Sequence, residues 1–192
     1  MDIAVIIPLF DGESWIRETL ESVVSQTYPS SEIVVVDDGS TDNSMAIVSE
    51  DFPDVRIETN PGEGPHDARN YGARITSAGK LAFLDQDDLW HEDHLKLIHR
   101  TFQQFPKCVG VFSEIASFSD LRPPDFSATG CEPRTYDPWE SFPYNELGEP
   151  VGGTVRREAF EEVDGWWPRA AGCDDYHLWL KLGVVGDLAI TG

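Results

Sequence analysis

The sequence predicts an α/β fold, with a mostly parallel central sheet and helices on both faces in three layers. Two observations predict it. Short apolar runs alternate with segments of helical periodicity along most of the 192 residues, a length sufficient for one such domain with a sizeable core. Several of these runs also stop abruptly at acidic loops, and the carboxyl ends of parallel strands share one edge of a sheet. We therefore expect the acidic loops to converge.

The first half of the chain is predicted to alternate between strands and helices. Continuous apolar runs indicate buried strands, and apolar residues repeated every three or four positions indicate helices. Ser14 is expected to cap the first helix, and the turn-forming residues 60–65 are expected to form a loop. The predicted strands are 3–9, 33–36, 55–59, 81–84 and 109–118, and the predicted helices are 15–25, 44–50, 66–77 and 92–105.

The second half is less regular. Residues 119–149 are rich in Pro, Asp and aromatic residues and have weak periodicity, which predicts an irregular excursion or a mobile loop over a site. Regular structure is expected to return near 152–155. Helices are predicted over 157–163 and 174–182, with a turn at 165–168. The chain is thus expected to form one domain, 1–192, whose halves are 1–118 and 119–192.

Charge and cysteine content exclude several classes of protein. Fourteen Lys and Arg against 35 Asp and Glu give a net charge of −21, which repels nucleic acid and anionic lipid. A phosphate-bearing ligand must therefore bind through a metal, local arginines or backbone N–H groups. The three cysteines lack zinc spacing, so reduced thiols in a cytoplasmic protein are expected. No signal peptide or membrane span is expected in this chain.

The most informative stretch is the acidic run that follows the strand 81–84. Asp85, Asp87 and Asp88 lie within four residues, and their mutual repulsion costs stability unless something neutralises it. Mg²⁺ or Mn²⁺ is typically held by one or two carboxylates plus substrate phosphates. The alternative is a solvated turn before a helix start. Similar acidic loops after the first two strands favour a site for a metal and a nucleotide.

Six segments, taken in order, carry a resemblance to a known family. They are 5–11, 22–28, 32–42, 68–72, 85–88 and 174–179. Over nearly the whole chain they resemble the family 2 glycosyltransferases. The resemblance implies a Rossmann-like fold of the GT-A type, a divalent cation (Mn²⁺ or Mg²⁺), and inverting transfer from a nucleotide-diphosphate sugar, above all a UDP-sugar. It implies a glycan or lipid-linked acceptor, polysaccharide or cell-surface glycan synthesis, and a cytoplasmic protein able to lie at the inner face of a membrane.

The resemblance places several residues around the nucleoside. Pro8, Phe10 and Asp11 would border the nucleobase and ribose, and Asp38 would accept a hydrogen bond from the base. Arg69 would meet the base or the diphosphate, since its guanidinium is always charged and offers a planar fork of donors.

The acidic run would hold the diphosphate and its metal. Asp85 would face ribose or metal, with Gln86 beside it in the donor site. Asp87 would bind the metal that bridges the diphosphate. Asp88 would either bind the metal or support one of its ligands.

Inverting transfer needs a base that removes the acceptor hydroxyl proton. The family's base position matches Asp174 and Asp175. Related sequences place the base at either acid of this pair, so the choice stays open, with Asp174 preferred. The competing interpretation is capping of a helix start.

Other residues suggest functions but favour structural roles. His91 and His94 resemble a metal pair, yet their spacing favours a surface helix. Cys173 is expected to be a packed thiol. Trp166 and Trp167 could stack on an acceptor sugar or pack in a core or an interface.

The sequence departs from the family pattern in places, and two other functions stay open. Asp11 stands where the family often has Asn, and the chain ends earlier than many relatives, so we expect a truncated catalytic domain. A non-catalytic nucleotide-sugar or glycan-binding domain of the same fold is one alternative. A nucleotidyltransferase is the other, although the Gly-rich basic phosphate loop typical of that class is missing near the first strand.

Overall fold

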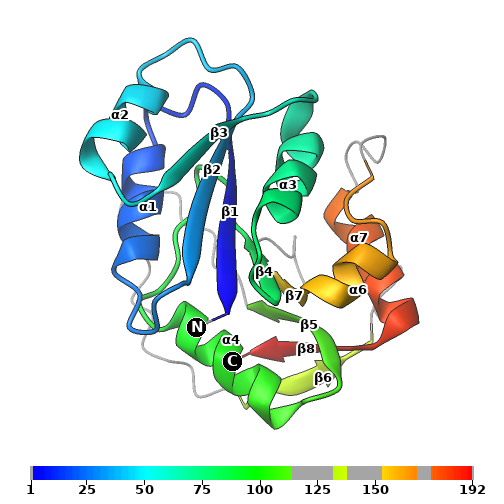
Figure 1. Cartoon of the computed structure of the whole chain (residues 1–192). Coiled ribbons are helices and arrows are strands. Elements are labelled where there is room, and N and C mark those ends of the chain that lie inside the picture. The colour runs from blue at the N-terminus through cyan, green and yellow to red at the C-terminus, as the bar shows by residue number, and fades with distance from the viewer. Residues whose placement is uncertain (1, 114–131, 138–152, 168–173, 192) are drawn as a thin grey trace.

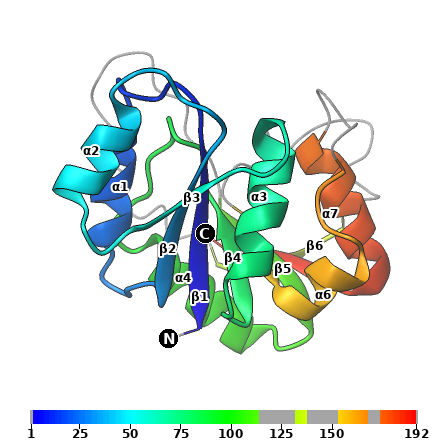
Figure 2. The same ribbon diagram turned by 45° about the horizontal axis from the view of Figure 1, so that its top comes forward.

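The computed structural model describes residues 2–113, 132–137, 153–167 and 174–191. An eight-stranded sheet with the order β3-β2-β1-β4-β7-β5-β8-β6 forms its centre. The strands β6 and β7 run antiparallel to their neighbours, and the other neighbouring strands are parallel. Helices α1, α2 and α4 cover one face, and α3, α6 and α7 cover the other (Figures 1 and 2). The predicted three-layer α/β architecture is confirmed.

The element bounds follow the predicted alternation. The strands are β1 (Ile3–Leu9), β2 (Glu32–Asp37), β3 (Arg56–Thr59), β4 (Lys80–Phe83), β5 (Cys108–Ser113), β6 (Arg134–Tyr136), β7 (Thr154–Arg156) and β8 (Asp187–Thr191). The helices are α1 (Ile16–Val24), α2 (Ser44–Asp51), α3 (Gly64–Ile75), α4 (His94–Gln104), α6 (Arg157–Glu162) and α7 (Asp174–Val185).

Strand β1 divides the core into two layers. All its residues are buried, because helices cover both faces of the sheet. Its odd-numbered residues pack with α1, α2 and α4, whereas Ile6 packs with residues of α3, α6 and α7. Burial on both faces explains why the apolar run lacks the alternation of a half-exposed strand.

The strand register brings the carboxyl ends of β1, β2 and β4 to one edge. Leu9 pairs with Asp37, and Asp37 pairs with Thr59. On the other side of β1, Ile6 pairs with Phe83. The loops that follow these strands therefore begin at the same edge of the sheet, as the sequence predicted.

Three predicted helix starts differ from the structure, and that of α4 lies at His94, two residues after the predicted residue 92. Trp15, and not Ser14, precedes the first residue of α1, and no side chain caps that helix end. Helix α3 begins at Gly64, two residues earlier than predicted, with Pro65 in its first turn. The fixed φ of proline suits the first helical position, so the turn signal of this Pro also marked a helix start.

Two strands were missed. Strand β6 lies within the segment predicted to be irregular, and β8 follows the last predicted helix. Strand β8 pairs with β5 and β6, which lie far from it in sequence, so local patterns carried little signal. The prediction for 114–118 and most of 119–149 lies outside the described residues.

Candidate active site

The loop after β1 is tied to the loop after β2 through Asp11. Its carboxylate accepts hydrogen bonds from the backbone N–H and the hydroxyl of Thr41, at 2.7 and 3.3 Å. Its own N–H donates to the Ser40 hydroxyl. Asp11 has a φ of 45°, a conformation that Asp and Asn tolerate better than most residues. An Asp therefore serves at this position as Asn could.

Phe10 and Pro8 differ in exposure. The Phe10 side chain is 55% exposed beside the loop, where a base could contact it. Pro8 is buried within β1 opposite Val36, so its ring supports the strand end from within the sheet.

Asp38 connects the loop after β2 to the start of α3. One carboxylate oxygen accepts a hydrogen bond from the Asn60 amide at 2.6 Å, and the other accepts from the Gly64 N–H at 2.9 Å. Asn60 also donates to the Gly64 carbonyl. Asn60 was not singled out from the sequence, although the Asn-Pro-Gly turn signal marks its position. Asp38 has a clear structural role, and its predicted contact with a base stays a prediction.

An ion pair lies at the end of β4. The Arg69 guanidinium, on α3, donates to the Asp85 carboxylate. The Arg69 side chain is 7% exposed and that of Asp85 is 36% exposed. Arg69 thus neutralises Asp85, whereas the sequence placed Arg69 against a base or a diphosphate and did not predict this pairing.

Gln86 fastens the loop after β1 to the end of β4. Its amide oxygen accepts from the Phe10 N–H at 2.8 Å, and its amide nitrogen donates to the Phe10 carbonyl at 3.0 Å. Its backbone carbonyl accepts from the Thr19 hydroxyl on α1. Gln86 therefore positions Phe10, which gives this residue a structural task within the predicted donor site.

Asp87 and Asp88 follow in a turn. Asp87 is exposed, Asp88 is partly buried, and the Asp88 N–H donates to the Asp85 carbonyl at 3.2 Å. Within the described ranges, no group of three or more His, Cys, Asp or Glu side chains could hold a metal. Exposed carboxylates at this edge fit Mg²⁺ or Mn²⁺ shared with a diphosphate, which needs few protein ligands, rather than a cage built by the protein alone.

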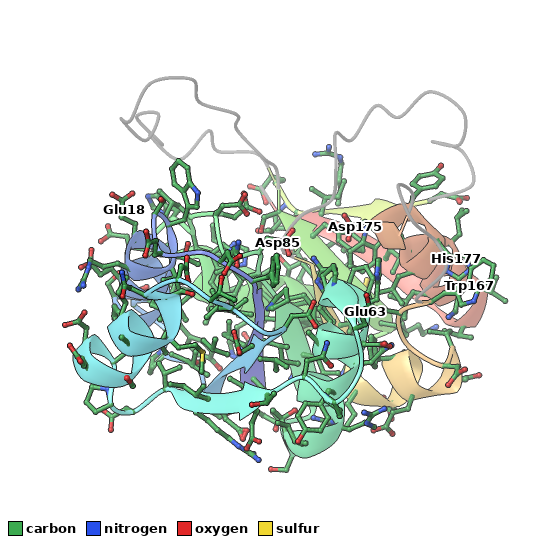
Figure 3. The ribbon with its side chains drawn as sticks, turned by 90° about the horizontal axis from the view of Figure 1, so that it is seen from above. Glu18, Glu63, Asp85, Trp167, Asp175 and His177 are labelled. Carbon is green, nitrogen blue, oxygen red and sulfur yellow. The ribbon has the colours of Figure 1, made fainter. Side chains whose placement is uncertain are left out.

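Helix α7 presents Asp175 on its buried face. Residues three and four apart share a helix face, so Asp175 lies on the face of Leu178 and Trp179, both buried. Asp175 is partly buried, and the Asp174 side chain lies outside the described part of the chain. In the view of Figure 3, Asp175 lies between Asp85 and the pair formed by Trp167 and His177.

The two adjacent tryptophans lie in different environments. Trp166 is 2% exposed and belongs to the core, so it packs and does not offer a surface to a sugar. Trp167 is 49% exposed, and its ring lies 5.1 Å from that of His177. Burial, followed by the charge of Lys181, lowers the pKa of His177.

The prediction of a surface position for His94 was wrong. His94 is buried, its ring stacks on Trp90 at 4.2 Å, and its Nδ1 is 3.1 Å from the Ser113 hydroxyl. Burial, followed by the charge of His91, lowers the pKa of His94 to about 3. His94 shares a helix face with Ile98 and Phe102, and this periodicity could have revealed its burial.

Cys108 is a free, buried thiol, and burial raises its pKa to about 11. Cys131 and Cys173 lie outside the described residues. In the part of the chain that the structure covers, no helix combines the length and apolarity needed to cross a bilayer.

Known proteins are similar to this chain in sequence. Residues 4–164 match Glycosyl transferase family 2. YibD of Escherichia coli (strain K12), an uncharacterized glycosyltransferase, is 30% identical over 148 residues, which are 76% of this chain and 39% of YibD. Glycosyltransferase GlyA of Streptococcus pneumoniae serotype 4 is 34% identical over 113 residues, 57% of this chain and 16% of GlyA. The chain thus spans well under half the length of these two relatives.

Solved structures confirm the GT-A-type fold. The crystal structure of S. aureus TarS 1-349 has a TM-score of 0.81 at 21% identity, covering 99% of this chain and 58% of that one. TarS structures in complex with UDP and with UDP-GlcNAc match equally well. The mannosyltransferase PcManGT from Pyrobaculum calidifontis, in complex with GDP-Man and Mn²⁺, has a TM-score of 0.68 at 21% identity, covering 98% and 56%. With the match over residues 4–164, the chain belongs to glycosyl transferase family 2.

Proposed function

We propose that this chain carries the catalytic centre of an inverting glycosyltransferase that uses a nucleotide-diphosphate sugar, preferentially a UDP-sugar. The observation that carries the proposal is the convergence of the loops after β1, β2 and β4 at one sheet edge, near the Asp175 end of α7. Family membership and the nucleotide sugars bound by proteins of the same fold support it.

The nucleoside would bind along the loops after β1 and β2. Phe10 offers an exposed ring to a base, and its position is fixed by Gln86. Asp38 keeps acceptor lone pairs beyond the two bonds it makes, since a carboxylate has about four such sites. A uracil N–H can donate to one of them.

The diphosphate would lie beside Asp87. The chain's net charge of −21 opposes a bound diphosphate unless a cation intervenes. Asp87, with Asp88 or Asp85 beside it, would hold Mn²⁺ or Mg²⁺ together with phosphate oxygens. When bound, the cation supplies Lewis-acid stabilisation of the leaving nucleoside diphosphate.

We propose Asp175 as the general base and keep Asp174, whose side chain lies outside the described part of the chain, as the alternative. Asp175 lies on the helix face that packs toward the core next to Arg69 and Asp85, through Trp179 and Trp166. Asp175 would take the proton of the acceptor hydroxyl as its oxygen attacks the anomeric carbon. The bond to the diphosphate oxygen breaks on the opposite side, so the anomeric configuration inverts.

The acceptor would approach from the second half of the chain. The exposed ring of Trp167 can stack on a sugar, and α7 carries the base from the same half. We propose that residues 1–118 bind the donor and 119–192 present the base and the acceptor, a glycan or a lipid-linked sugar. A lipid-linked acceptor would bring the chain to the inner face of a membrane.

The test compares Asp175→Asn with Asp174→Asn as its matched control. General-base help typically contributes about 10²–10⁴-fold, so Asp175→Asn should lower sugar transfer, or slow donor hydrolysis, by that factor. Affinity for UDP with Mn²⁺ and the melting temperature should stay near wild type. The control should keep most of the turnover.

Three results would contradict the proposal or its details. Loss of turnover in Asp174→Asn alone would move the base to that residue. Wild-type turnover in both variants would return the acidic pair to helix capping. Donor binding by the wild type without transfer to any acceptor and without hydrolysis would favour a non-catalytic binding domain.

A further inference from the structure

We propose that Trp166 is a positioning residue that holds Arg69 against Asp85 and connects this ion pair to α7. The inference rests on the proposed function, because it assigns Asp85 to the donor site. The Arg69 guanidinium carbon lies 4.8 Å from the centre of the Trp166 ring, over its face. The same guanidinium donates to Asp85. The cation is therefore held between an aromatic face and a carboxylate.

The Trp166 ring is itself fixed from several sides. It makes edge contacts with Phe83 of β4 at 5.4 Å and with Trp179 of α7 at 6.1 Å. Phe83 comes two residues before Asp85, and Trp179 lies one helical turn after Asp175. One buried ring thus contacts the strand that carries the acidic run and the helix that carries the proposed base.

The backbone of Trp166 is also clamped. The Asn70 amide donates to its carbonyl at 2.8 Å and accepts from its N–H at 2.9 Å. Asn70 directly follows Arg69 on α3, so one helical turn holds both the cation and the backbone of the residue that covers it. The preceding Gly165 has a φ of 55°, and a Cβ there would lie 2.5 Å from the Asn70 amide oxygen. Glycine is therefore required for this clamp.

The ring face, and not the indole N–H, carries this function. The indole N–H of Trp166 is buried and has no hydrogen-bond partner among the described residues. Trp is the best aromatic partner for a cation, and a phenyl ring is weaker. Trp166→Phe should therefore retain part of the effect, whereas Trp166→Leu removes the π face and should lose it.

Loss of the Trp166 ring should weaken donor binding at the acidic run 85–88. Without the aromatic face, Arg69 no longer holds the Asp85 carboxylate in one position at the start of the acidic turn. Binding of UDP with Mn²⁺ would weaken because the geometry of the whole acidic turn is disturbed. The strength of a cation–π contact depends on whether the site is exposed or desolvated. Across that range of strengths, we expect Trp166→Leu to lower UDP affinity by about two- to thirtyfold.

A double-mutant cycle tests whether Trp166 acts through Arg69. UDP affinity in Mn²⁺ is measured by calorimetry for Trp166→Leu, Arg69→Met and the double variant. If Trp166 acts through Arg69, Trp166→Leu weakens binding in the wild-type background and changes nothing further in the Arg69→Met background. Phe160→Leu, in the same core against Phe83, serves as a packing control that should lower the melting temperature but keep UDP affinity.

A ligand-free measurement separates this inference from the proposed function. In ¹⁵N NMR spectra of arginine side chains, Arg69 should give a ring-shifted Nε–H signal that exchanges slowly with water. Trp166→Phe should reduce this shift, and Asn70→Ala should speed the exchange. An Arg69 signal that matches the exposed arginines in the wild type would overturn the inference, as would equal affinity losses from Trp166→Leu in both backgrounds. Failure of the wild type to bind UDP, with the NMR signature intact, would count against the proposed function alone.

Discussion

The acidic loops after β1 and β2 and the acidic run after β4 look alike in sequence but differ in structure. In the first region, Asp11 and Asp38 accept hydrogen bonds from backbone and side-chain donors of neighbouring loops. In the second region, Asp85 is neutralised by Arg69 and Asp87 is exposed. The first two loops therefore use their carboxylates to hold the edge of the candidate site together. In the run after β4, the exposed Asp87 is the carboxylate that we propose binds a cation.

Substitution of Asp85 should destabilise the protein much more than substitution of Asp87. Asp85→Ala leaves the buried Arg69 without this partner, and a hydrogen bond to a charged group is worth about 1.5–3 kcal/mol. We expect a loss of that size in the free energy of unfolding, measured by urea denaturation. Asp87→Ala should change stability by no more than about 0.5 kcal/mol, as for most exposed sites. Equal losses in the two variants would break the distinction.

Buried His94, at the start of α4, should make the stability of the protein sensitive to acid. The folded-state pKa of His94 is about 3, whereas an unfolded histidine titrates near 6.5, so below pH 6.5 the unfolded chain binds a proton that the folded chain does not. Stability should therefore fall as the pH falls, with about 2 kcal/mol lost at pH 5 from this residue. Urea denaturation at pH 7.5 and pH 5 measures the loss.

His94→Gln is the matched control for this prediction, because a glutamine can still bond to the Ser113 hydroxyl but does not titrate. The variant should lose less stability between the two pH values than the wild type. The same loss in both proteins would show that other groups cause the acid sensitivity.

Asp38→Ala tests whether the loop after β2 contacts the nucleobase in addition to its structural role. Asp38→Ala should cost about 1 kcal/mol of stability through the bonds to Asn60 and Gly64. If Asp38 also contacts a base, this variant should weaken UDP binding roughly tenfold. Asn60→Ala disturbs the same loop but keeps the Asp38 carboxylate. Equal weakening in both variants, measured by calorimetry, would limit Asp38 to a structural role.

The sequence predicted the first half of the fold well, because its signals are local. The apolar run of β1 lies between helices on both faces, and its bounds were predicted to the residue. The end of β4 was predicted within one residue, since three acids interrupt an apolar run there. Strand β6 could not be read in the same way, because its pairing with β8 depends on residues about 50 positions away.

The candidate site was predicted as a set of residues but not as a set of contacts. Asp85 and Arg69 were both named, yet nothing local to either one signals that they pair. The opposite environments of Trp166 and Trp167 were also hidden, since two adjacent indoles give no indication of which one is buried. Side-chain partners across elements depend on tertiary packing, which a single sequence does not display.

We propose that the run after β4 binds a diphosphate through a divalent cation at Asp87. Calorimetry of UDP binding in Mn²⁺ and in EDTA tests this proposal. Asp87→Ala is compared with Glu18→Ala, which removes one charge from the first turn of α1 and lies well apart from Asp85 in the view of Figure 3. We predict that Mn²⁺ strengthens UDP binding to the wild type and to Glu18→Ala, and that Asp87→Ala loses most of this gain. Equal UDP affinity of the wild type in Mn²⁺ and in EDTA, or an undiminished gain in Asp87→Ala, would contradict cation-mediated binding at Asp87.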